Sequence, residues 1–255
     1  MLAKEVSHAH STAYALTAAT WVHIGRRDPQ ATQAQAEELI KFTTEQGFPY
    51  WLTQGNILWG WAAAQQGQEE GLPRMRQHLS QWQAMATETV KHAFLGLMAD
   101  VCWKRQQTEE GLALVDGALV VVEKTGECFY EPELYRLKGQ LTLQQSSVQG
   151  LAFSVQRNQR AKGKEQKAKP ANRQSLPPNP QAEAEACFHK AIEIARQQQA
   201  KSLELRAAMS LAQLWQSQGK KEEAHEMLAE IYGWFTEGFD TKDLQEAKAL
   251  LEELE

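Results

Sequence analysis

The stretch that decides the fold is AAMSLAQLWQSQGKKEEAHEML, which runs from Ala207 to Leu228. Apolar residues recur every three or four positions on both sides of Gly219, a spacing that is typical of amphipathic helices. Gly219 falls where the first helix would end, and glycine favours such an end. The second helix opens on a small residue, Ala224. The stretch therefore predicts two antiparallel helices joined by a short turn.

Copies of this unit recur along the chain. The small residues that open the second helix of each predicted pair lie 40, 73 and 40 residues apart: Gly71, Gly111, Ala184 and Ala224. Small residues on the first helices have intervals of 42, 39, 40 and 73: Ala18, Gly60, Ala99, Gly139 and Ala212. Two independent positions thus indicate a repeat of about 40 residues and one insertion of 33 residues.

The same patterning predicts eleven helices, at about residues 8–25, 30–46, 50–66, 70–87, 89–105, 109–124, 131–145, 182–198, 202–218, 222–235 and 241–254. Small residues at fixed places let paired helices approach closely. A single hairpin still exposes apolar surface, which only the next hairpin can cover, so the copies should stack. The predicted fold is an all-α, right-handed α-solenoid of about five hairpins plus a C-terminal helix. Asp240 is expected to cap that helix, and Asp243 to interact with its dipole.

The insertion divides the chain into three parts: repeats over 1–145, a basic insert over 146–180, and repeats with the terminal helix over 181–255. The insert has seven basic residues and one acid, few apolar residues and a proline-rich end, which together predict disorder. It is interpreted as a tolerated surface loop. The alternative is a basic tether that docks on an acidic partner or an anionic surface.

Composition and motifs exclude several function classes. No run of 18 apolar residues predicts a membrane span, and the N-terminus lacks a signal-peptide core, so a cytoplasmic protein is expected. The net charge of −5, with basic residues gathered in the insert, does not suggest nucleic-acid binding. Three isolated cysteines and scattered histidines predict no metal site and no catalytic site. We expect no cofactor and no enzymatic activity.

The unit resembles a tetratricopeptide repeat, with Ala212, Trp215, Gly219, Ala224 and Leu228 at matching places but a longer period than is usual for that family. Three segments, FYEPELYRLKG (129–139), 184–215 and 228–254, resemble the C-terminal solenoid of large bacterial signalling ATPases and nucleotide cyclases. This resemblance implies a non-catalytic, partner-binding or sensor region. No phosphate-binding GxxxxGK[ST] motif is present.

The start of the chain is also unusual for such an array. Residues 1–6 align with the end of a second helix, so the chain is interpreted as starting inside a repeat, as a truncated or split gene product would. A first hairpin without a cap predicts self-association, or pairing with a separate partner, through that end.

The concave groove of the predicted solenoid is the candidate binding site, because the first helix of each pair should line it. Tryptophan and arginine are frequent in binding hot spots, so the groove could bind a peptide or an acidic protein segment. Alternatively, the tryptophans pack between hairpins and the arginines pair with nearby glutamates. A second functional hypothesis is a domain that senses a small ligand in the groove. The residues predicted to face the groove are Trp61, Asp100, Trp103, Arg136, Gln140, Arg206 and Gln213.

Overall fold

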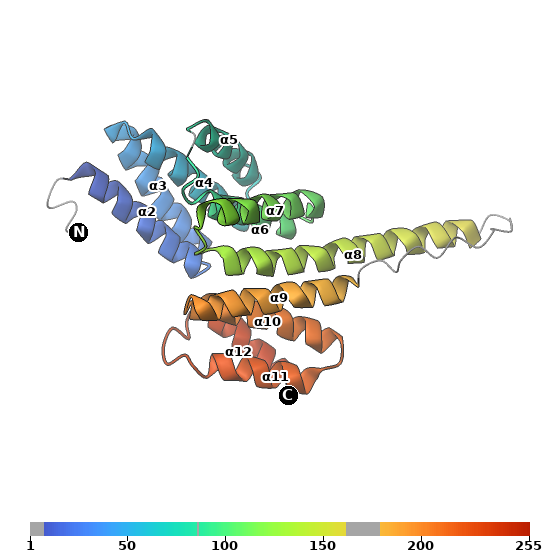
Figure 1. The fold of residues 1–255 in the computed structure, drawn as a ribbon. Coiled ribbons are helices and arrows are strands. Elements are labelled where there is room, and N and C mark those ends of the chain that lie inside the picture. The colour runs from blue at the N-terminus through green and yellow to red at the C-terminus, as the bar shows by residue number, and fades with distance from the viewer. Residues whose placement is uncertain (1–7, 86, 162–178) are drawn as a thin grey trace.

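The structure is a computed structural model that describes residues 8–85, 87–161 and 179–255. Within these ranges every regular element is an α-helix, and the helices follow one another as antiparallel neighbours (Figure 1). Their bounds are α2 Ala9–Gly25, α3 Pro29–Gln46, α4 Pro49–Gln65, α5 Gly71–Ala84, α6 Lys91–Lys104, α7 Thr108–Thr125, α8 Glu131–Ala161, α9 Pro180–Gln197, α10 Lys201–Ser217, α11 Lys221–Tyr232 and α12 Lys242–Leu254.

Each helix packs on its neighbour in sequence, which makes five hairpins: α2–α3, α4–α5, α6–α7, α8–α9 and α10–α11. The first helices of successive hairpins also pack on one another, and α12 packs on α10 and α11. The predicted α-solenoid of about five hairpins and a C-terminal helix is therefore confirmed. The predicted helix ends lie within a few residues of the observed ones, with one exception.

The exception is α8, which was expected to end at Gln145 but continues to Ala161. That boundary is wrong because the prediction weighed charge and missed helix propensity. Residues 146–161 contain no proline, and eight of these 16 residues (three Gln, two Ala, two Arg and one Leu) favour helices. The longer helix covers the first part of the predicted insert, and the disorder of the insert stays a prediction. The rest of the insert, residues 162–178, lies outside the described residues, as do residues 1–7 with the predicted helix end.

The small residues lie at the predicted close approaches between helices. A Cβ added to Gly71 would lie 2.5 Å from the backbone nitrogen of Ala64 and 2.5 Å from the carbonyl oxygen of Gly60. In the fourth hairpin, a Cβ on Gly139 would lie 2.5 Å from the ring of Phe188. The paired helices therefore approach each other where the side chain is a hydrogen atom, as the repeat spacing predicts.

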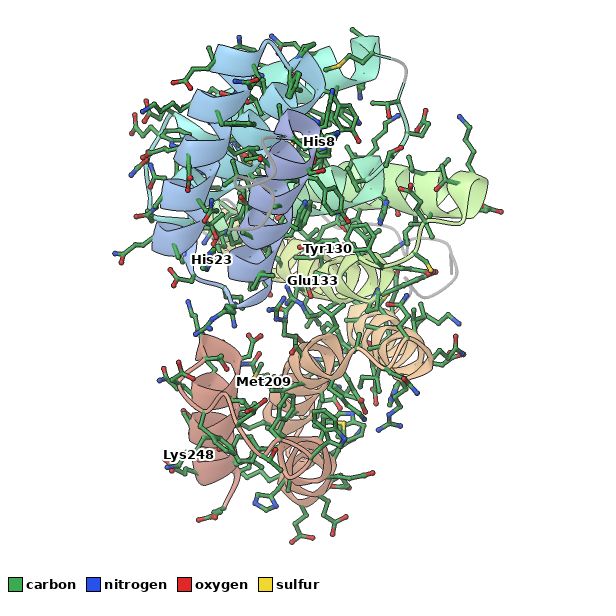
Figure 2. All side chains as sticks on the ribbon, turned by 90° about the vertical axis from the view of Figure 1, so that its left-hand side faces the viewer. His8, His23, Tyr130, Glu133, Met209 and Lys248 are labelled. Atoms are coloured by element: carbon green, nitrogen blue, oxygen red, sulfur yellow. The ribbon has the colours of Figure 1, made fainter. Side chains whose placement is uncertain are left out.

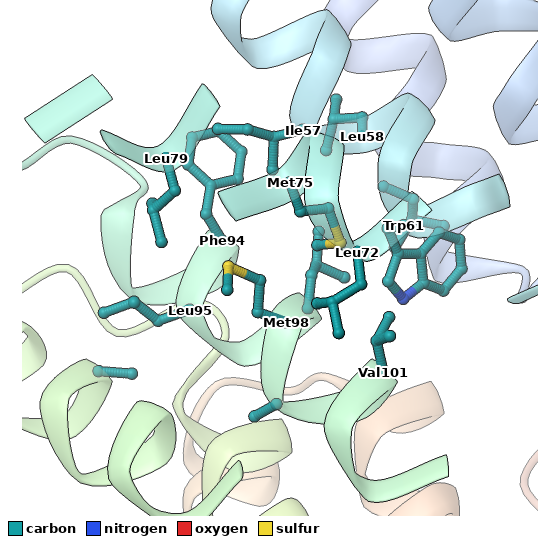
Figure 3. Close-up of a cluster of buried hydrophobic side chains, with 14 of the residues drawn as sticks. Ile57, Leu58, Trp61, Leu72, Met75, Leu79, Phe94, Leu95, Met98 and Val101 are labelled. Carbon is teal, nitrogen blue, oxygen red and sulfur yellow. The ribbon is translucent and has the colours of Figure 1, made fainter. Parts of the chain in front are cut away.

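The buried apolar side chains form two clusters rather than one. The first extends from Ile24 to Leu141 and joins the first three hairpins to α8; Figure 3 shows its centre. The second extends from Ala184 to Leu254 and joins α9 to α12. Helix α8 contacts both, since Leu141 belongs to the first cluster and Leu143 packs against the second.

Helix α2, at the N-terminal end of the array, also contacts residues on the concave side of later hairpins. The Trp21 ring is 6.0 Å from that of Phe94 in α6 and 6.3 Å from that of Tyr130 at the start of α8. At the C-terminal end of α2, the carbonyl of Gly25 accepts a hydrogen bond from Arg206 of α10. The array therefore curves far enough for its first hairpin to meet its last helices.

Candidate binding groove

The end of α2 divides the concave groove into two chambers, and Ile24, Tyr130 and Arg206 line both. Figure 2 shows Tyr130 and Glu133 beside the end of α2 that carries His23, with Met209 across from them on α10. We call the two spaces the polar chamber and the aromatic chamber.

The polar chamber has a volume of about 390 Å³. Its walls come from the α2–α3 turn and from α4, α6, α8, α10 and α12. The structure brings all seven residues of the predicted groove to this chamber: Trp61, Asp100, Trp103, Arg136, Gln140, Arg206 and Gln213. The spacing of the repeat thus identified residues that line one chamber of the groove. Their binding role stays a prediction.

A buried ion pair forms the centre of the polar chamber. Arg136 donates to Glu133 through Nε at 2.9 Å and Nη2 at 2.7 Å, with exposures of only 9% and 5%. Burial alone would raise the pKa of Glu133, but the charge and hydrogen bonds of Arg136 outweigh it and hold the pKa at about 2. The Arg136 guanidinium also lies 5.8 Å from the centre of the Trp103 ring.

Asp100 is bound by its neighbours in the same chamber. Its Oδ2 accepts from Trp61 Nε1 at 3.1 Å and from Gln65 Nε2 at 2.6 Å. Gln65 in turn accepts a hydrogen bond from Lys104. The Asp100 carboxylate therefore links α4 to α6 across two hairpins, and its position is set by the protein itself.

Asp243 of α12 binds two arginines. Its Oδ2 accepts from Arg206 Nε at 2.7 Å and its Oδ1 from Arg27 Nη1 at 2.9 Å. Arg27 also pairs with Glu246. The cap predicted for α12 is wrong, because Thr241, not Asp240, is its N-cap, and Asp240 pairs with Arg26 at 3.3 Å. Asp243 lies in the first turn of α12, as predicted, and binds the two arginines as well.

These contacts agree with the packing interpretation of the groove residues. Arg136 and Arg206 each pair with an acid of the chain itself. Trp61 is buried within the first apolar cluster, and Trp103 packs against that cluster. The polar chamber is thus a wall of mutually satisfied charges, which costs less to bury than isolated charges would.

The aromatic chamber is larger and more open, with a volume of about 670 Å³. Tyr14 is 66% exposed and Phe129 is 47% exposed, which is high for large apolar residues that share one hollow. Among the described residues that line it, the charged ones are Arg26 and Arg206 and none is acidic. Its aromatic side chains come from α2, α4 and the segment before α8: Tyr14, Trp21, Tyr50, Trp51, Phe129 and Tyr130.

The aromatic chamber was not predicted from the sequence, although the repeat contained a signal for it. Tyr50, Val90, Tyr130 and Leu203 all line the chamber and recur at the intervals of the repeat itself. This row lies at the beginning of each first helix, one to three turns before the positions that were assigned to the groove.

His92 lies under the rim of the aromatic chamber, with its ring 4.8 Å from that of Phe129. The side chain is fully buried, and neither ring nitrogen has a hydrogen-bond partner among the described residues. Burial lowers the pKa of His92, against the opposing effect of Glu127. The folded-state pKa is therefore below the unfolded value of about 6.5, so stability should fall as the pH drops below about 6.5.

We expect His92→Leu to stabilise the protein by about 1 kcal/mol at pH 7, because two unsatisfied polar atoms leave the core. The gain should grow below pH 6.5. Urea unfolding at pH 7.5, 6.5 and 5.5 measures both effects. His189→Gln, which changes a histidine whose side chain is 54% exposed, is the control for removing a histidine as such. The prediction would be contradicted if the free energy of unfolding changed equally with pH in His92→Leu and in the parent protein.

Within the described ranges, no group of three or more His, Cys, Asp or Glu side chains could hold a metal ion. In the same part of the chain, no helix is long and apolar enough to cross a membrane.

Comparison with known proteins places the fold among tetratricopeptide-like repeats. No protein-family model and no curated protein matches the sequence. Among the solved structures that match the fold are two of nearly identical TPR-like repeats of a kinesin light chain from Podosopora anserina. One has a TM-score of 0.52, 12% identity, and covers 88% of this chain and 94% of its own. The other has a TM-score of 0.50, 12% identity, and covers 95% and 96%.

Proposed function

We propose that this chain is a non-catalytic scaffold for protein–protein interaction, which binds a peptide segment of its partner in the aromatic chamber. One observation carries the proposal: six aromatic side chains from several repeats gather in one open hollow, and two of them remain well exposed. Aromatic residues dominate the energetics of protein interfaces. Repeat solenoids expose extended concave surfaces of this kind.

The charges around the aromatic chamber suit an apolar segment that also carries a carboxylate. Arg26 lines the chamber and is 53% exposed, and its pair with Asp240 spans 3.3 Å at the surface. Such exposed pairs contribute at most about 1 kcal/mol, so a carboxylate of the partner can replace Asp240 at little cost. The proposed partner is therefore a protein segment with aromatic or aliphatic side chains next to an acidic residue.

The wider context of the proposal comes from the resemblance of segments 129–139, 184–215 and 228–254. In that context the chain is the repeat region of a bacterial signalling ATPase or cyclase, working in the cytoplasm as part of, or split from, such a protein. Residues 1–145 and 181–255 would act as one scaffold, with the insert between them. Self-association through the first hairpin stays a prediction.

Selection from a displayed library of random 12-residue peptides tests the proposal. We expect enriched peptides to combine aromatic and acidic residues. Tyr14→Ala and Phe129→Ala should each weaken the enriched peptides about 10-fold, since each removes an exposed aromatic contact. Trp234→Ala is the matched control, because Trp234 is 58% exposed but does not line the chamber. Equal affinity for all four proteins in fluorescence anisotropy would refute the assignment of the chamber.

The second candidate function is small-ligand sensing, which the polar chamber favours. Its volume of about 390 Å³ falls in the range of small-molecule sites, and it presents Gln140 and Gln213 beside its ion pairs. A ligand that binds only the folded protein raises the melting temperature. A thermal-shift screen with a panel of sugars, amino acids and nucleotides, without any protein partner, tests this function separately from peptide binding.

A further inference from the structure

The two ends of the array meet through charged side chains. Arg26 and Arg27 of the α2–α3 turn contact Asp240, Asp243 and Glu246, some 214 to 219 residues away. Within the described chain, α2 and α3 make no close backbone contact with α10, α11 or α12. Figure 2 shows the two parts of the molecule facing each other across this junction. The hydrogen bonds that close the junction therefore come from side chains, including the one that Arg206 donates to the carbonyl of Gly25.

The junction contains both strong and weak ion pairs. The Arg206–Asp243 pair is buried, with side chains 9% and 8% exposed, so loss of one partner leaves an uncompensated charge. The Arg26–Asp240 pair is exposed and contributes little. Arg27 is intermediate, with its side chain 28% exposed and bound to both Asp243 and Glu246.

The backbone of Arg27 gives a second, independent sign that this residue has a role. Its φ is +54°, in the left-handed region that side chains other than glycine rarely adopt. The corresponding turn positions in other hairpins are Gly67, Gln106 and Gly219, all with positive φ. Glycine adopts this conformation without steric cost. Arg27, like Gln106 in the third hairpin, therefore carries a steric cost that glycine would avoid, and at Arg27 the contacts with Asp243 and Glu246 offset that cost.

We propose that Arg27 and Arg206 form an electrostatic latch with Asp243 and Glu246 that holds the superhelix closed. The inference deepens the proposed function and rests on it in one respect. The aromatic chamber has walls from α2 and from α10, which are the parts that the latch holds together. Opening the latch separates these walls and therefore weakens peptide binding. Because coupling between two sites is reciprocal, a bound peptide stabilises the closed form by the same free energy.

Replacing Arg27 by glycine separates a latch role from a turn role. If Arg27 were only a turn residue, Arg27→Gly would relieve backbone strain and raise the melting temperature by about 2–4 °C. The latch predicts the opposite sign, a lower melting temperature. Gln106→Gly is the matched control at the same position of the third hairpin, outside the latch, and should raise the melting temperature. A rise in both variants would overturn the proposal.

A distance measurement tests closure directly and needs no peptide. Spin labels at Gln30→Cys and Lys248→Cys, both exposed, report the separation of α3 and α12 in a protein that also carries Cys128→Ser and Cys187→Ser. We expect one narrow distance distribution at 50 mM NaCl. With Arg27→Gly, or at 1 M NaCl where surface pairs are screened, the distribution should broaden to longer distances. An unchanged distribution under both conditions would overturn the latch.

The peptide experiment then separates failure of the latch from failure of the proposed function. With the peptides enriched from the displayed library, Arg27→Gly should weaken binding at least 3-fold although Arg27 does not line the aromatic chamber. Unchanged binding would overturn the link between closure and the chamber. Loss of binding in Tyr14→Ala with no change in Arg27→Gly would support the proposed function and reject only its dependence on the latch.

Discussion

Gly71→Ala is expected to destabilise the protein by about 3 kcal/mol, at the upper end of the range for overpacking. The added Cβ would lie 2.5 Å from the backbone nitrogen of Ala64 and 2.5 Å from the carbonyl oxygen of Gly60. These are main-chain atoms of α4, so no side chain can rotate away and the two helices must separate. Urea unfolding followed by circular dichroism measures the change.

Gly117→Ala is the matched control for this prediction. Gly117 lies inside α7, is exposed, and has no atom within 4 Å of an added Cβ. The same chemical change should therefore stabilise the protein by up to about 1 kcal/mol, because alanine favours a helix more than glycine does. If Gly71→Ala cost less than about 1 kcal/mol, the close crossing of α4 and α5 would be disproved.

Glu133→Gln should have the largest effect among the charged residues, a loss of about 3–5 kcal/mol, because it leaves the buried Arg136 without a counter-charge. Arg136 is 9% exposed and makes both of its side-chain hydrogen bonds with Glu133. Adding Arg136→Met to Glu133→Gln removes the orphaned charge, so the double variant should be more stable than Glu133→Gln alone. Urea unfolding at pH 7 compares the three proteins.

The cost of Glu133→Gln should also depend on pH in a defined direction. Burial raises the pKa of Glu133, but Arg136 lowers it further, to about 2 in the folded protein, whereas the unfolded value is about 4.3. A depressed pKa stabilises the fold above the unfolded value, and this contribution disappears as the pH falls towards the folded value. The difference between the parent protein and Glu133→Gln should therefore shrink between pH 4.3 and pH 2. A constant difference would show that the charge of Glu133 is not responsible.

The repeat and its helices could be predicted from the sequence because both depend on neighbouring residues. The small residues at Gly60, Gly71 and Gly139 mark helix crossings within one hairpin. Counting from them also placed Asp100, Gln140 and Gln213, which recur at the intervals of the repeat, in one chamber. The local register therefore determines the row of a residue on the concave side.

The closure of the array could not be predicted in this way. It depends on the curvature added by each hairpin, and a small change per repeat moves the last helix by a large distance. Asp243 looked like an ordinary acid in the first turn of a helix, since nothing near it in the sequence indicates Arg27. The aromatic chamber was missed for a different reason. Its residues recur at the interval of the repeat but are both aromatic and aliphatic, and among the aromatic residues only the tryptophans had suggested a binding role.

The contacts of Arg27 with α12 have a consequence for the evolution of the array. An open solenoid can gain or lose whole units by duplication or deletion, because each unit depends only on its neighbours. Here Asp243 and Glu246 meet the first turn only after five hairpins have brought α12 back to it. One unit more or fewer would shift α12 by a full step along the superhelix. Selection for this contact would therefore fix the copy number, while the α8–α9 connection stays free to vary in length.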